Sequence, residues 1–146
     1  MNNKFMKYYY NIVIFFLILT GFGQMPIFKR FYIADIPGLG WLAEFYKTFF
    51  IHNLAATLLI VFIFYLLTTF LLNKKRVKLT MTGIVWVASL TGLLLTGILL
   101  TIKNFPINPY PPGFVVFLYL SHIALVMAFC MTALYSKILK KEYIIK

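Results

Sequence analysis

The chain has 146 residues, of which 62% are hydrophobic and only 12% are charged. A soluble domain is about half apolar and about a quarter charged, so a soluble globular fold is excluded and the excess apolar surface must face lipid. The formal charge of +11 comes from 14 Lys and Arg against three acids, but these cations cluster at the ends of apolar runs, which favours a membrane protein over a nucleic-acid-binding one. Cys130 is the only cysteine, so neither a disulfide framework nor a cysteine-rich metal motif is expected.

The first predicted membrane helix covers residues 5–22 and follows a short basic N-terminus. A charged start before an apolar run is also typical of a signal peptide. However, the residues from Gly21 to Pro26 are too bulky for a small-x-small cleavage site. The run is long enough to span a bilayer, which takes about 17–25 residues, and we expect a retained helix.

The second predicted membrane helix covers residues 49–72 and follows a loop over residues 24–48. The loop contains the turn-forming run Ile36-Pro37-Gly38-Leu39-Gly40. Its last part predicts a helical start at the membrane surface, where Trp41 and Tyr46 would act as interfacial anchors.

Two further helices complete the expected fold. The third covers residues 79–102 and contains Thr and Gly at short intervals, which lets another helix or a flat ligand come close. Residues 103–112 contain four prolines and cannot form a helix. The fourth helix covers residues 113–139, so the prediction is an all-α integral membrane four-helix bundle, in one domain over residues 1–146.

Lys and Arg are unequally distributed between the two sides that these helices define. Ten lie on the side that holds the termini and the loop between the second and third helices. The other side holds four: Lys29, Arg30, Lys47 and Lys103. The positive-inside rule therefore predicts that both termini are cytoplasmic. The expected location is a bacterial inner (cytoplasmic) membrane, which the chain crosses several times.

The chain contains two histidines, and both lie within predicted membrane helices. His52 lies in the second helix and His122 in the fourth, and the predicted topology places both in the outer half of the membrane. Ionisable side chains within a membrane are costly and rare, so a functional role is their default interpretation. For either histidine alone, a packing role with hydrogen bonds to Asn53 or Ser121 is the alternative.

Two imidazoles favour haem over other metal centres. A zinc site takes three or four protein ligands, and no Cys or carboxylate lies near either histidine to supply them. Haem supplies four equatorial nitrogens itself and needs only two axial ligands, for which His is common. We therefore predict one haem per chain, with His52 and His122 as the iron ligands, of the non-covalent b type because Cys-x-x-Cys-His is absent.

The predicted haem pocket also includes glycines and cations. Three glycines would leave space for the porphyrin: Gly21, Gly92 and Gly97. Helix packing explains these glycines at least as well. Four cations of the outer loops are candidate partners for the haem propionates: Lys29, Arg30, Lys47 and Lys103. A solvated charged loop is the ordinary explanation for these cations.

Short segments in all four helices resemble a known family. They are Leu19–Gly23, Phe50–Ala56, the Thr-Gly repeats of the third helix, and Leu120-Ser121-His122. They resemble the four-helix b-type cytochromes of respiratory complexes, with the gamma (membrane) subunits of formate dehydrogenase and related hydrogenase cytochromes as type cases. The resemblance implies that His52 and His122 ligate the outer haem of that family. The first helix has no histidine for an inner haem, and the corresponding part of the fourth helix holds Ser136, so a second haem is expected to be absent.

The resemblance implies an electron-transfer membrane subunit that works between the quinone pool and an iron–sulfur or other redox subunit. The loop over residues 24–48 would be the docking surface. Two alternatives stay open, namely a haem-free anchor or assembly subunit of a respiratory complex, and a stand-alone oxidoreductase acting on a small molecule such as superoxide. A transporter or channel is disfavoured because the last three helices look continuous. Quinone is a candidate second cofactor. No acid lies within the spans, so any proton path to it must use water, Tyr, Thr or loop acids, and no residues are assigned to a quinone site.

Overall fold

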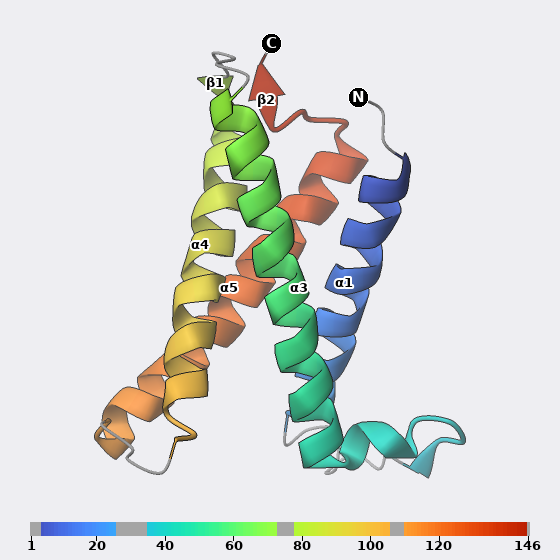
Figure 1. The fold of residues 1–146 in the computed structure, drawn as a ribbon, viewed down its shortest axis with the longest axis vertical. Coiled ribbons are helices and arrows are strands. Elements are labelled where there is room, and N and C mark those ends of the chain that lie inside the picture. The colour runs from blue at the N-terminus through green and yellow to red at the C-terminus, as the bar shows by residue number, and fades with distance from the viewer. Residues whose placement is uncertain (1–3, 26–34, 73–77, 106–109, 146) are drawn as a thin grey trace. The chain divides into compact units, whose positions relative to one another are not determined.

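The computed structural model of the chain describes residues 4–25, 35–72, 78–105 and 110–145. Most of the described residues are helical. The chain divides into two compact units, Met1–Lys74 and Lys75–Lys146. Each unit contains one pair of long antiparallel helices (Figure 1).

The first unit is built from α1 (Lys4–Gly23) and α3 (Phe45–Leu72), which pack against each other. Val13, Ala55 and Leu59 are buried, and the ring of Tyr9 packs against Phe62 across the two helices, while many other large aromatic side chains of both helices are exposed. This pattern suits helices in lipid, where association depends on close packing and hydrogen bonds because lipid tails are as apolar as the side chains.

A short 3-10 helix, η2 (Gly40–Ala43), covers the C-terminal end of α1. Leu42 is 1% exposed, and its carbonyl oxygen lies 3.0 Å from the position that a Cβ of Gly23 would take. The span α3 begins at Phe45, earlier than predicted. Glu44 has extended backbone and separates η2 from α3, so the helical start predicted at residues 41–47 is divided between these two helices.

The second unit is built from α4 (Met81–Ile102) and α5 (Pro112–Ile138), again an antiparallel pair. The two helices approach closely at Gly92, where an added Cβ would lie 2.9 Å from Cδ1 of Leu125. A glycine at this position therefore lets the leucine side chain of one helix pack onto the backbone of the other.

The C-terminal segment returns to the start of α4. Two short strands, β1 (Lys78–Leu79) and β2 (Ile144–Ile145), pair in antiparallel fashion. The backbone N–H of Thr80 donates to the carbonyl of Tyr143 at 3.1 Å, and its hydroxyl donates to the carbonyl of Glu142 at 2.9 Å. The sequence prediction ended with the fourth helix and did not include this pairing, because a two-residue strand has no detectable pattern.

The four long helices are each long and apolar enough to cross a membrane. Between 11% and 17% of the most apolar window of each is buried within the protein, so most of their apolar surface needs a lipid environment. The predicted all-α membrane fold with four spanning helices is confirmed. Its bounds (5–22, 49–72, 79–102 and 113–139) differ from the observed ones by four residues at most. The cytoplasmic placement of both termini stays a prediction.

Candidate functional site

His52 lies near the N-terminal end of α3, where that helix packs against α1. Its Nδ1 is 3.0 Å from Oγ1 of Thr20, a residue of the last turn of α1 that has no exposed surface. The imidazole itself is half-buried. The contact between Thr20 and His52 joins the C-terminal end of α1 to the N-terminal part of α3.

The direction of this hydrogen bond follows from a second contact of the threonine hydroxyl. Oγ1 of Thr20 lies 2.5 Å from the carbonyl oxygen of Phe16. A carbonyl oxygen carries no hydrogen, so at this distance the hydroxyl proton lies between the two oxygens. With that proton committed, the threonine oxygen would accept a hydrogen bond from Nδ1–H of His52, and in the neutral imidazole Nε2 would then be the unprotonated nitrogen.

His122 repeats this arrangement in the second unit. Its Nδ1 is 2.8 Å from Oγ1 of Thr96, and the hydroxyl of Thr96 donates to the carbonyl of Gly92 at 2.8 Å. With its proton donated to a carbonyl, the threonine would accept from Nδ1–H, and in the neutral ring Nε2 would be the basic nitrogen. Because Thr96 belongs to α4 and His122 to α5, this bond also joins the two helices of one hairpin.

The two imidazoles are suited to axial ligation of an iron. Histidine ligands of metals usually donate their other ring N–H to an oxygen, which fixes the tautomer and the ring orientation. Within the described ranges, no three His, Cys, Asp or Glu residues lie together as metal ligands would. Haem takes two axial ligands from the protein, and each of the two histidines, one in each unit, contacts a threonine through Nδ1; their joint ligation of one haem stays a prediction.

The three glycines predicted for the haem pocket have different surroundings. A Cβ at Gly21 would lie 3.4 Å from Cε1 of His52, and a Cβ at Gly97 would lie 3.7 Å from Cε1 of His122. Gly21 and Gly97 therefore lie beside the two imidazole rings. Gly92 instead faces a leucine of α5, so close helix packing accounts for it, and its predicted place beside haem stays a prediction.

The predicted propionate partners lie in loops or at helix ends. Lys103 directly follows α4, and its Nζ donates to the hydroxyl of Tyr119 at 2.9 Å and lies 5.1 Å from the ring centroid. Lys47 forms an exposed ion pair of 2.8 Å with a nearby glutamate. Lys29 and Arg30 fall outside the described residues. The role of these four cations toward a haem stays a prediction.

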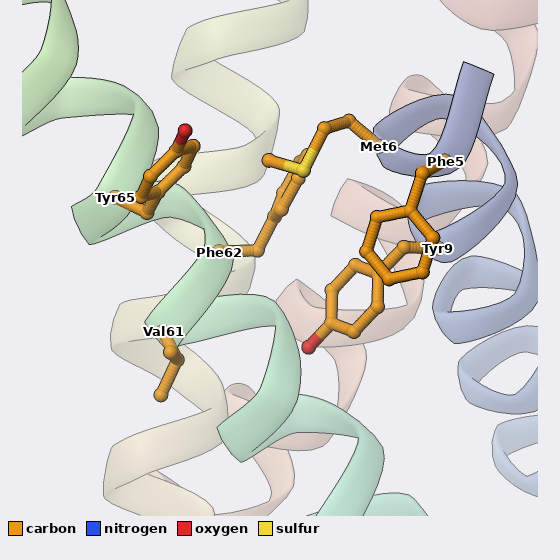
Figure 2. A pocket seen from close by; sticks show the side chains of 6 residues that line it. All are labelled: Phe5, Met6, Tyr9, Val61, Phe62 and Tyr65. Atoms are coloured by element: carbon orange, nitrogen blue, oxygen red, sulfur yellow. The ribbon is translucent and has the colours of Figure 1, made fainter. Parts of the chain in front are cut away.

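A shallow apolar groove of about 380 Å³ lies between α1 and α3. Figure 2 shows its lining, three side chains from each helix: Phe5, Met6, Tyr9, Val61, Phe62 and Tyr65. The hydroxyl of Tyr9 donates to the carbonyl of Leu58 at 3.1 Å, and its ring centroid lies 5.4 Å from that of Phe62. The lining contains no acid and no histidine, so the groove adds no acid–base group to the candidate site.

Two residues of the candidate site, Thr20 and Thr96, were not predicted as site residues from the sequence. A signal for them exists, because each is the middle residue of a Leu-Thr-Gly tripeptide near the end of the first helix of its unit. The same tripeptide also occurs at residues 90–92, where Thr91 is exposed. The tripeptide alone therefore does not select the threonine that meets a histidine.

Comparison with protein-family models, with curated proteins and with solved structures found no match for this chain. The class of protein therefore follows from the fold alone. The protein is a helical, multi-pass membrane protein with four candidate spanning helices among its described residues.

Proposed function

We propose that this protein is a membrane cytochrome of b type that binds one haem through His52 and His122 and transfers electrons. The observation that carries the proposal is the repeated hydrogen bond from histidine Nδ1 to a threonine hydroxyl, at 3.0 Å in one unit and 2.8 Å in the other. In both cases the bond would leave Nε2 as the basic nitrogen of the neutral ring, which is the state that an axial ligand requires. The chain has no other histidine.

Haem, when bound, supplies one-electron transfer at its iron. The chain supplies the two imidazoles, the threonines that orient them and an apolar membrane environment that limits access of water. Burial and hydrogen bonding of the axial ligands are the means by which a protein sets a haem potential. The predicted spans contain no carboxylate. The proposed role is therefore electron transfer in which no carboxylate within the membrane accepts a proton.

The proposed electron donors and acceptors are the quinone pool and an iron–sulfur or other redox subunit, in a bacterial cytoplasmic membrane. This part rests on the resemblance of the helix segments to respiratory cytochromes b. Asp35 and Glu44 in the loop before α3 and Lys47 in the first turn of α3 are exposed and charged, and we propose residues 24–48 as the docking surface.

The test is a reduced-minus-oxidised visible spectrum of the protein purified from haem-sufficient cells, with haem quantified per chain. The variants are His52→Ala and His122→Ala. Matched controls are Ser121→Ala, a half-buried neighbour of one histidine, and Thr57→Val, an exposed residue of α3 whose hydroxyl donates within its own helix. We expect a low-spin b-type spectrum at about one haem per chain in the parent and the controls, and its loss in each histidine variant.

Three results would contradict the proposal in different ways. Absence of haem from the parent protein would overturn the cytochrome and leave a haem-free anchor or assembly subunit. Two haems per chain would show that a ligand other than histidine had been missed. Full haem retention in either histidine variant would remove that residue from the ligand set.

A further inference from the structure

We infer that Thr20 and Thr96 are positioning residues that hold the two imidazoles at Nδ1 and so orient them for ligation through Nε2. The inference rests on the proposed haem function and adds to it the residues that prepare the ligands. It starts from two hydrogen bonds, one in each unit of the chain. Each joins Oγ1 of a threonine to Nδ1 of a histidine.

The repetition argues against incidental packing. In each unit the threonine lies in the second half of the first long helix, and the histidine lies in the first half of the second. In each unit the glycine after the threonine lies beside the imidazole, with a Cβ position 3.4 Å from Cε1 of His52 or 3.7 Å from Cε1 of His122. One residue therefore bonds the ring while the next leaves room for it, and the arrangement occurs twice.

The threonine hydroxyl is a strong acceptor in both units because its own proton is donated to a backbone carbonyl. The acceptors are Phe16 at 2.5 Å and Gly92 at 2.8 Å, each four residues before its threonine. Chains of hydrogen bonds of this kind polarise one another. The hydroxyl thus draws on the Nδ1 proton and increases electron density at Nε2, as a carboxylate does in other metal sites.

A neutral acceptor also suits the membrane location. A carboxylate at the same position would add a charge within the apolar span, where charged groups are costly. The hydroxyl is satisfied by one carbonyl and one imidazole, and neither bond adds a charge.

The test compares removal of each hydroxyl with its retention. Thr20→Val and Thr96→Val keep the shape of the side chain but delete the acceptor, whereas Thr20→Ser and Thr96→Ser keep the hydroxyl. Thr91→Val is the control in α4, because Thr91 is the middle residue of another Leu-Thr-Gly tripeptide and is exposed. Thr68→Val is the control in α3, because this exposed hydroxyl donates to the carbonyl of Phe64 in its own helix.

Four quantities are measured on protein that elutes as one species with parental helicity. They are the haem dissociation constant, the reduction potential, the low-spin electron paramagnetic resonance spectrum, and the histidine tautomer of the haem-free protein by nitrogen-15 NMR. We expect each valine variant to bind haem about 10- to 100-fold more weakly and to shift the potential upward. We expect the serine variants and both controls to match the parent, and the haem-free parent to show protonated Nδ1.

The positioning role of the threonines and the proposed cytochrome function are contradicted by different results. Parental haem affinity, potential and spectrum in both valine variants would overturn the positioning role while leaving the proposed cytochrome intact. A parent that shows protonated Nε2 in the haem-free state would also overturn it, whatever the haem content. A parent that binds no haem overturns the proposed function, and the role of the threonines toward haem with it.

Discussion

The carbonyl oxygen of Tyr143 occupies the position that a Cβ of Gly83 would take. The C-terminal segment therefore lies directly on the first turn of α4, where no side chain intervenes. The ring of the tyrosine also packs against Trp86, with centroids 5.6 Å apart. A single missing side chain thus permits the segment to pair with β1.

Substitution of Gly83 by alanine is expected to displace this C-terminal segment. The new Cβ would overlap a backbone carbonyl, which cannot move aside as a flexible side chain would. We expect a loss of about 1–3 kcal/mol, larger than the roughly 0.5–1 kcal/mol that alanine gains over glycine in a helix. The measurement is the rate of limited proteolysis near residue 143 and the unfolding temperature in detergent. Gly113→Ala is the control, because nothing lies within 4 Å of its added Cβ, and an equal effect in both variants would contradict this account.

Gly92→Ala is expected to destabilise the second hairpin by forcing α4 and α5 apart. Its Cβ would lie 2.9 and 3.1 Å from the two terminal carbons of Leu125. We expect a net loss of about 1 kcal/mol, seen as a lower unfolding temperature, because the strain of overpacking is eased by movement of the Leu125 side chain and offset by the roughly 0.5–1 kcal/mol that alanine gains over glycine in a helix. The double variant with Leu125→Ala tests the contact, since removal of the leucine methyl groups should make the glycine substitution nearly neutral. Simple addition of the two losses would show that the contact is not the cause.

Lys103 and Tyr119 are expected to be coupled by a small free energy. The ammonium donates to the phenol at 2.9 Å and lies 5.1 Å from the ring centroid, so it gains both a hydrogen bond and a cation–π interaction. At an exposed site these amount to about 0.5–1 kcal/mol together. A double-mutant cycle of Lys103→Met and Tyr119→Leu measures the coupling through the free energy of unfolding. A coupling energy of zero would mean that the contact does not contribute in the membrane protein.

The distribution of cations predicts which loops face the cytoplasm. In a Cys130→Ala background, Asp35→Cys is expected to react with an impermeant maleimide added to intact cells, whereas Glu142→Cys is expected to react only after the cells are lysed. Both residues are exposed in the structure. The opposite pattern of labelling would reverse the predicted orientation of all four spans.

The pattern of apolar runs was sufficient to predict the four helices, because each span must satisfy its backbone hydrogen bonds internally and present apolar side chains to lipid. Both constraints act on residues close together in the chain. The C-terminal return to Thr80 was not predicted, since it depends on contacts across more than sixty residues, such as the hydroxyl of Thr80 with the carbonyl of Glu142.

The histidines were recognisable as candidate ligands because ionisable residues are rare in such spans. The threonines that contact them were not recognisable from the sequence. Thr91 and Thr96 are each the middle residue of a Leu-Thr-Gly tripeptide. Only the packing of α4 against α5 brings Thr96 to His122. Likewise, nothing in the composition separates Gly97, which lies beside an imidazole, from Gly92, which contacts a leucine.

The sequence by itself thus determined the membrane class, the number of spans and the identity of the two candidate ligands, since these follow from hydrophobicity, length and residue scarcity. The tertiary structure decided which side chain contacts Nδ1 of each histidine. That contact depends on the packing of the two helices of each unit, which brings the hydroxyl of Thr20 to His52 and the hydroxyl of Thr96 to His122.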